Sequence, residues 1–140
     1  MEYTSLTRDD IYRIQTSFLK ISEKQNKIGE NFYDRLFKAN PDMIKLFKGD
    51  MKEQARNLMK MVKIVVDGLN NPQIIVAAVQ DLGIRHYELG VTVKDYKIFG
   101  DNLIDCIEAE LGKDFDAKTK AAWQKLYSEL AEVMRGNQYK

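Results

Sequence analysis

The sequence predicts an all-α protein, and three observations support this fold class. Only two prolines and eight glycines occur in 140 residues, which leaves little turn chemistry for a sheet. No alternation of apolar and polar residues is long enough to indicate a half-buried strand. Apolar residues instead recur at steps of three and four along most of the chain. Hydrophobic residues make up 44% of the composition, enough for one core, so residues 1–140 are expected to form a single domain.

The first half of the chain is expected to contain four helices. Thr7, followed by Asp10 three residues later, resembles a capping arrangement at the start of the first helix. Gly29 lies inside the second helix, where glycine makes the helix about 1 kcal/mol less stable than alanine would. A glycine at this position therefore indicates a close crossing by another helix. Asn40 and Pro41 are typical of a helix start. The expected ranges are 7–24, 26–39, 40–47 and 51–69.

The second half is expected to contain three further helices. Asn71 is suited to be an N-cap, with Pro72 at the first helical position. Thr92 with Asp95 again resembles a capping arrangement, and Gly112 is expected to end that helix. A short link then leads into the last helix, which suggests an antiparallel pair. The expected ranges are 71–89, 92–111 and 116–137.

The charge balance excludes two classes of partner. Lys plus Arg number 22 and Asp plus Glu number 21, and the charges are scattered, so neither a nucleic-acid surface nor an anionic-membrane patch is indicated. The longest apolar-rich run, residues 59–66, is interrupted by Lys60 and Lys63, so no membrane span is expected. A single cysteine and an N-terminus without an apolar leader favour a soluble protein of the cytoplasm.

His86 is the only histidine in the sequence, and its position is the main functional clue. On a helical model it lies on an apolar stripe with Ile75, Val79, Leu82 and Leu89, at steps of four and three. A lone histidine on such a face is more often a satisfied core residue than a ligand. A zinc site is not expected, because only Cys106 could join it as a second strong ligand. A haem iron needs only one protein ligand, so a haem site is the functional alternative.

Two other polar residues have both an ordinary and a functional interpretation. Tyr33 lies one turn beyond Gly29 and on spacing alone is an ordinary core aromatic with its hydroxyl at a carbonyl or at the surface. Gln54 lies at the edge of the apolar seam of residues 51–69, where its amide reaches either solvent or a cavity. The spacing by itself favours the ordinary interpretation for both.

Over nearly its whole length the chain resembles the globin family. The resemblance rests on LGIRHYELGV around the histidine, then DYKIFGDNLIDCIEAELGKDF and AAWQKLYSELAEVM, in the family's order and spacing. The chain is most similar to bacterial single-domain globins and to the haem domain of flavohaemoglobins, and less similar to neuroglobin-like chains. The resemblance implies a three-over-three helical sandwich around haem b, with His86 as the proximal iron ligand and Phe47 stacked on the haem.

The resemblance also assigns the other site residues. Tyr33 matches the distal tyrosine of flavohaemoglobins, Gln54 the distal glutamine, and Leu58 the apolar residue above the iron. Gly29 and Ala55 match the small residues at which the second helix and the distal helix cross. The expected cofactor-binding residues are Phe47, Leu58, Leu82, His86, Val91 and Tyr96, with His86 as the metal ligand and with Tyr33 and Gln54 as the catalytic pair.

One position departs from the flavohaemoglobin pattern. Those proteins have a glutamate near the proximal histidine, where this sequence has Gln138. A neutral amide stabilises imidazolate character less than a carboxylate does, so weaker electron donation to the iron is expected. Because the sequence stops two residues later, no flavin domain is expected, and any redox cycle needs a separate reductase.

The expected function is reversible binding of dioxygen, with nitric oxide and carbon monoxide as further ligands. Tyr33 and Gln54 can each donate to a partially negative oxygen ligand, which implies slow oxygen release. The alternative is a nitric oxide dioxygenase that works with a separate reductase. A third class is a haem-based gas sensor, or a haem-free helical interaction module on the same fold.

Overall fold

The computed structural model of the chain describes residues 6–139, so residues 1–5 and 140 of the expected domain lie outside the described part. Within it the chain forms helices joined by short turns, and no strand. The all-α prediction is therefore confirmed. The helices are α1 (Arg8–Glu23), α2 (Gln25–Ala39), η1 (Pro41–Leu46), α3 (Met51–Asp67), α4 (Gln73–Glu88), α5 (Val93–Leu111), η2 (Gly112–Asp114) and α6 (Ala117–Arg135), where η denotes a 3-10 helix.

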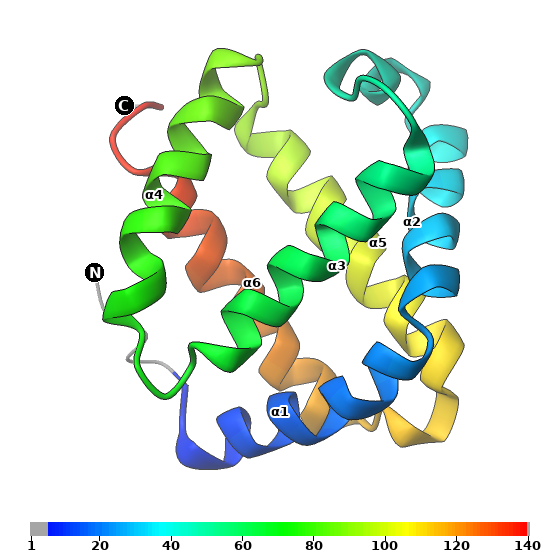
Figure 1. Cartoon of the computed structure of the whole chain (residues 1–140), viewed down its shortest axis with the longest axis vertical. Helices are drawn as coiled ribbons and strands as arrows, with labels where there is room; N and C mark the ends of the chain where they lie inside the picture. Colours follow the sequence, from blue (N-terminus) through cyan, green and yellow to red (C-terminus); the bar gives the residue numbers. More distant parts are fainter. Residues whose placement is uncertain (1–5, 140) are drawn as a thin grey trace.

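The helices form a three-over-three sandwich, as the resemblance implies. One layer contains α1, α3 and α4, and the other contains α2, α5 and α6 (Figure 1). The main packing partners of α3 are α2 and α1, whereas α4 packs on α6. Helices α5 and α6 contact each other and run in opposite directions, which confirms the antiparallel pair (Figure 1). Helices α3 and α4, which carry Gln54 and His86, are thus each supported by the opposite layer.

Both capping arrangements predicted from the sequence are present. At α1 the Asp10 N–H donates to Thr7 Oγ1, and the Thr7 N–H donates to the Asp10 carboxylate, both at 3.0 Å. The same reciprocal pair joins Thr92 and Asp95 at α5. These bonds satisfy backbone donors that a helix start otherwise leaves without partners.

Three helix boundaries differ from the expected ones by two residues, and most of the others differ by one. Helix α3 ends at Asp67, before Gly68, rather than at residue 69. At α4 the cap position is taken by Pro72, with helical dihedral angles, and not by Asn71. The Pro72 carbonyl accepts from the Val76 N–H, so the first helical hydrogen bond starts one residue later than expected. Helix α6 ends at Arg135 because Gly136 adopts a φ of 48°, a left-handed value that glycine accommodates without steric cost.

Two glycines allow close helix crossings. A Cβ on Gly29 would lie 2.9 Å from the Cβ of Ala55, so the expected crossing of α2 and α3 is confirmed. At Gly83 a Cβ would lie 2.0 Å from the backbone oxygen of Met134, which shows that α4 and α6 approach even more closely. Only glycine permits this approach, because any side chain there would overlap the α6 backbone.

The core contains apolar side chains from all six α-helices, and buried polar groups are paired across it. The Trp123 indole N–H on α6 donates to Ser17 Oγ on α1 at 2.9 Å. The Asn102 amide on α5 donates to the Phe32 carbonyl on α2, also at 2.9 Å. The first bond joins the two layers and the second joins two helices of the same layer, and each is favoured because a buried donor without a partner is costly. No helix of residues 6–139 combines the length and the apolarity that a membrane crossing requires.

Candidate functional site

His86 lies in the last turn of α4 and is half-buried. Its stripe is only partly confirmed: Ile75 and Val79 are buried and Leu82 is half-buried, but Leu89 is 58% exposed. The expectation that Leu89 faces inward is wrong: Leu89 is the C-cap residue beyond the end of α4 at Glu88, and its side chain is exposed there. The stripe therefore ends at the histidine.

The imidazole of His86 has a buried nitrogen with no hydrogen bond. Nδ1 is buried and has no partner among the described residues. Burial lowers the pKa of His86, while the nearby Leu82 carbonyl opposes this shift without reaching hydrogen-bond geometry with Nδ1. The ring is thus favoured in its neutral form, which is the form that binds a metal ion.

Tyr96, in the first turn of α5, lies next to His86. The two ring centroids are 6.2 Å apart and the planes are inclined by 74°. The hydroxyl of Tyr96 is buried with no hydrogen-bond partner among the described residues, and burial raises its pKa to about 12. Val91, half-buried between the two helices, donates its N–H to the His86 carbonyl at 3.1 Å. The structure therefore brings together three of the residues that were expected to bind the cofactor.

Tyr33 is buried on α2, and an aromatic group surrounds it. Its ring contacts Phe47 at 5.2 Å and Phe37 at 5.9 Å, and Phe47 and Phe37 also contact each other. Burial raises the pKa of Tyr33 to about 12, so its hydroxyl is protonated at neutral pH. That hydroxyl makes no hydrogen bond within residues 6–139. Phe47 is placed by the end of η1, where the chain leaves the 3-10 helix in an extended conformation.

Helix α3 carries the other two expected distal residues. Leu58 is half-buried and packs against the core, and Gln54 is also half-buried. The Gln54 amide nitrogen donates to the Lys48 carbonyl at 2.8 Å, in the loop that precedes the helix. One of its two amide protons is therefore engaged by the protein itself, and the second remains available to a ligand.

The residues present fit a haem group. The unpaired imidazole nitrogen shows that His86 is not a satisfied core histidine, and no group of three His, Cys, Asp or Glu that could hold a metal exists in the described chain. A metal with its own equatorial ligands needs only one such imidazole. Half-buried apolar side chains that would contact a flat apolar ring are Phe47, Leu58, Val62, Leu82, Val91, Ile98 and Phe99. No contact between described residues joins Tyr33 to His86, so the two groups form separate sides of the candidate site.

The sequence did not identify Tyr139 as part of this region. Its hydroxyl donates to the Val91 carbonyl, and its ring contacts Tyr87 and Tyr96 at 5.1 and 6.4 Å. Gln138, which was expected near the histidine, has its side-chain oxygen 2.7 Å from where a Cβ on Gly136 would stand, and that oxygen is buried with no hydrogen-bond partner among the described residues. No local sequence pattern indicates that Tyr139 lies in this region, because its position depends on the turn at Gly136.

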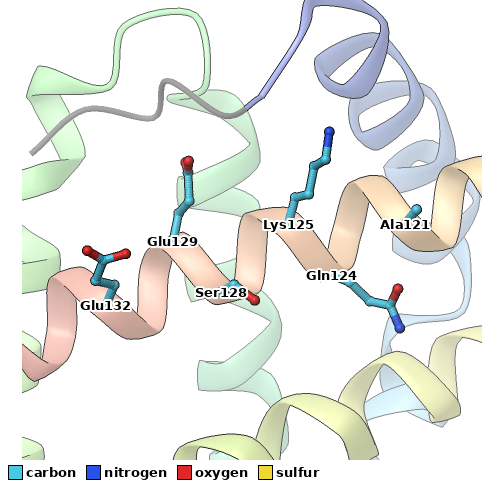
Figure 2. Close-up of a pocket in the computed structure, with 6 residues that line it drawn as sticks. All are labelled: Ala121, Gln124, Lys125, Ser128, Glu129 and Glu132. Carbon is cyan, nitrogen blue, oxygen red and sulfur yellow. The ribbon is translucent and has the colours of Figure 1, made fainter.

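A groove on the outer face of α6 contains none of the expected site residues. Figure 2 shows the side chains of Lys125 and Glu129 on the same side of the helix above this groove. Lys125 also forms an ion pair with Asp10 of α1 at 3.1 Å. The lining is mostly polar and charged, which does not suit an apolar cofactor. The lining residues are Ala121, Gln124, Lys125, Ser128, Glu129 and Glu132.

The fold and the site together define a helical-sandwich protein that offers one half-buried imidazole beside apolar and aromatic side chains. The family model described as Globin matches residues 30–134. The chain therefore belongs to the globin family.

Curated relatives and a solved structure agree with this assignment. The chain is 29% identical over 110 residues to the flavohemoprotein of Rhizobium meliloti (strain 1021), and 25% identical over 121 residues to that of Bordetella pertussis (strain Tohama I). These matches cover 76% and 84% of the chain but only 27% and 30% of those proteins. A solved structure described as an engineered carbene transferase, from a putative nitric oxide dioxygenase of Rhodothermus marinus, has a TM-score of 0.85 at 22% identity. It covers 96% of this chain and 94% of its own, which confirms the globin fold.

Proposed function

We propose that the protein is a haem b globin that reversibly binds dioxygen and other diatomic ligands. The observation that carries the proposal is the buried Nδ1 of the only histidine, which has no partner among the described residues of a globin fold. The Nε2 atom of His86 also makes no hydrogen bond with the described residues, so this nitrogen is free to bind iron. Residues 1–140 act as one domain of the cytoplasm in this proposal.

Each side of the site has a separate task. When bound, the haem supplies an iron centre that takes a diatomic ligand on its distal face. His86 holds that group from the proximal side, and Tyr96 packs edge-on against the imidazole and limits its rotation. Phe47, Leu58, Leu82 and Val91 exclude water with their apolar surfaces, which lowers the local dielectric constant.

Tyr33 is the main polar group on the distal side. Because its pKa of about 12 keeps the hydroxyl protonated, it acts as a hydrogen-bond donor and not as an anionic ligand near neutral pH. A donor in a low-dielectric pocket stabilises a polar ligand such as dioxygen by about 1 kcal/mol or more, and carbon monoxide by less. Gln54 is the second donor in this proposal, through the amide proton that the Lys48 carbonyl does not engage. Slow oxygen release follows, which suits scavenging or chemistry better than delivery.

A second candidate function is nitric oxide dioxygenase activity with a separate reductase. The relatives support it: the curated matches are named flavohemoprotein, and the solved structure derives from a putative nitric oxide dioxygenase. The chain corresponds to between 27% and 33% of the length of these curated relatives. In this proposal a separate reductase therefore donates the electrons. Nitrate formation from nitric oxide and oxygen, in the presence of an added reductase, distinguishes this enzyme from a binder or a gas sensor.

The test is an optical spectrum of the purified protein after addition of haem. The wild type is expected to show a Soret band and near-stoichiometric haem. His86→Leu should retain the fold but lose stable haem, because no second histidine can replace it. Ile84→Ala, an exposed change on the same helix, serves as the control and should keep the band. A wild type without a Soret band would favour a haem-free interaction module, and normal haem binding by His86→Leu would contradict the proximal assignment.

A further inference from the structure

We propose that Tyr96, Tyr139 and Tyr87 form an electron-transfer path between the imidazole of His86 and the protein surface. The inference rests on the proposed function, because the path has an oxidant at its inner end only if His86 holds a haem. It goes beyond that function, since it adds a one-electron reaction on the proximal side, where no gas ligand binds. The observation that carries it is an unbroken series of ring contacts that ends at an exposed phenol.

The four rings of this series follow one another at short distances. The ring centroids of His86 and Tyr96 are 6.2 Å apart. Those of Tyr96 and Tyr139 are 6.4 Å apart, and those of Tyr139 and Tyr87 are 5.1 Å apart. The rate of electron tunnelling falls exponentially with distance, so several short steps between neighbouring rings are faster than one long step. The series therefore connects the imidazole to the surface in three steps.

Tyr87 is the end of the series that faces solvent. It is 47% exposed, whereas Tyr139 is half-buried and Tyr96 is buried. Although Tyr87 follows His86 in the sequence, no ring contact joins the two side chains within residues 6–139. The ring contacts thus lead from the imidazole through α5 and the C-terminal turn before they return to α4.

The surroundings of the three hydroxyls decide where an oxidised tyrosine is stable. A phenol that loses an electron must also release its hydroxyl proton to form a neutral phenoxyl radical. Burial and the neighbouring Tyr139 raise the pKa of Tyr96 to about 12, and its hydroxyl has no hydrogen-bond partner among the described residues. The Tyr139 hydroxyl donates to the Val91 carbonyl, which is not a base. Of the three, only Tyr87 has water as a proton acceptor, so the radical is expected to form there.

The other oxidisable rings of the described chain lie outside the series. The Tyr33 ring contacts only phenylalanine rings, which are much harder to oxidise than a phenol, so an oxidised Tyr33 has no onward route. The Trp123 indole is buried against α1, where its N–H donates to Ser17. Neither ring contacts a member of the series. The proximal tyrosines are therefore the route by which ring contacts reach the surface from His86.

The reaction balances with hydrogen peroxide as the oxidant and ascorbate, a small one-electron reductant, as the electron source. Hydrogen peroxide takes two electrons and two protons, its O–O bond breaks, and it leaves as two waters. Each electron comes from Tyr87, whose O–H bond breaks as the proton passes to water. The phenoxyl radical then takes one electron and one proton from ascorbate, which restores the tyrosine. Two such passages consume one peroxide and two ascorbates, so Tyr87 is a surface entry for electrons.

The experiment compares Tyr87→Phe, Tyr139→Phe and Tyr12→Phe with the wild-type chain, each loaded with haem to the same Soret absorbance. Phenylalanine keeps the ring but is not oxidised, and Tyr12, which is 67% exposed and outside the series, provides the control. Peroxide is added with a nitroso spin trap, and peptide mass spectrometry locates the trapped radical. The wild type and Tyr12→Phe should carry the adduct on Tyr87. Tyr139→Phe should lose it from that position although Tyr87 is still present.

Bleaching of the Soret band by peroxide provides the second readout. Oxidising equivalents that cannot leave stay at the haem, so Tyr87→Phe and Tyr139→Phe should bleach faster than the wild type and Tyr12→Phe. Ascorbate should slow bleaching in the wild type and in Tyr12→Phe, and do so much less in the other two variants. If only Tyr87→Phe loads with haem, its bleaching and its response to ascorbate still decide the role of the exposed phenol.

Three results would overturn the inference. An adduct that persists on Tyr87 in Tyr139→Phe would show that the electron passes directly between His86 and the next residue. A haem-loaded wild type without an adduct on Tyr87 would remove the path and leave the proposed function intact. A wild type that takes up no haem would overturn the proposed function and the path together.

Discussion

Gly29 of α2 and Ala55 of α3 touch at the crossing of their helices, where a Cβ on the glycine would lie 2.9 Å from that of the alanine. Tyr33 lies one turn beyond Gly29, and Gln54 and Leu58 lie on either side of Ala55 along α3. The distance between the proposed distal donors is therefore set by two small residues. This contact explains why a glycine is kept inside a helix at a cost of about 1 kcal/mol.

Gly29→Ala is expected to destabilise the fold although alanine favours the helix. The added methyl group meets the Ala55 Cβ, which is too short to move aside, so the two backbones must separate. Overpacking of this kind costs about 1–3 kcal/mol, more than the gain in helix propensity. Urea denaturation measures the change. The double variant Gly29→Ala with Ala55→Gly should recover part of the loss, whereas an unchanged midpoint in the single variant would show that the crossing has room.

Tyr33→Phe is expected to speed oxygen dissociation by about ten-fold and to alter carbon monoxide dissociation much less. The hydroxyl is lost but the ring contacts with Phe37 and Phe47 remain, so packing is preserved. Loss of a hydrogen-bond donor mainly weakens binding of the more polar ligand, dioxygen. Stopped-flow measurements on both ligands test this. Equal effects on oxygen and carbon monoxide would show that Tyr33 contributes only packing.

Gln54→Leu is expected to change oxygen dissociation in the same direction but by a smaller factor. One amide proton of Gln54 is engaged by the Lys48 carbonyl, so less of its donor capacity faces a ligand. The comparison needs the same stopped-flow protocol and the Gln54→Leu/Tyr33→Phe double variant. A larger effect at Gln54 than at Tyr33 would mean that the amide leaves Lys48 when a ligand binds.

The ferrous protein is expected to be five-coordinate in the absence of a gas ligand. The chain has one histidine, which the proposed function assigns to the proximal side, so a second imidazole is not available. The buried phenol of Tyr33 stays protonated, with a pKa of about 12, and a neutral phenol is a poor ligand for ferrous iron. Optical spectra after dithionite reduction test the coordination number. A dominant six-coordinate low-spin species would indicate a lysine or methionine ligand from this chain.

Stability is expected to fall in acid partly through Asp10. A hydrogen bond from the Thr7 N–H lowers the pKa of Asp10 from 3.8, and Lys125 contributes in the same direction. The charged form is favoured in the folded state, so this stabilisation is complete above about pH 4 and is lost as the pH falls through the lowered pKa. Asp10→Asn should therefore cost about 1 kcal/mol at pH 7 and much less at pH 2.

Urea denaturation of Asp10→Asn at the two pH values measures this difference. Asp34→Asn is the matched control, since Asp34 is exposed on α2 and forms no hydrogen bond or ion pair with the rest of the described chain. The control should change the unfolding free energy little at either pH. An equal loss at pH 7 and pH 2 in Asp10→Asn would mean that the carboxylate charge contributes nothing.

Local signals in the sequence determined most of the helical architecture. The Thr7 and Thr92 caps, the end of α5 at Gly112 and the Gly29 crossing follow from neighbouring residues and from the steric demands of glycine, so they could be predicted. Histidine count is likewise a sequence property, and it restricts the proximal ligand to His86. The start of α4 after Pro72 and the end of α6 at Arg135 were less predictable. Each boundary depends on which of several adjacent residues adopts the turn conformation.

The tertiary structure alone decided which side chains meet. Leu89 has the right spacing for the apolar stripe but is exposed, because α4 ends one residue earlier. Gln54 binds the Lys48 carbonyl because the loop before α3 turns back toward the helix. Tyr139 reaches Val91, 48 residues away in sequence, through the turn at Gly136. Periodicity reports the face of one helix, whereas contacts between distant residues depend on how the helices cross and where the chain reverses.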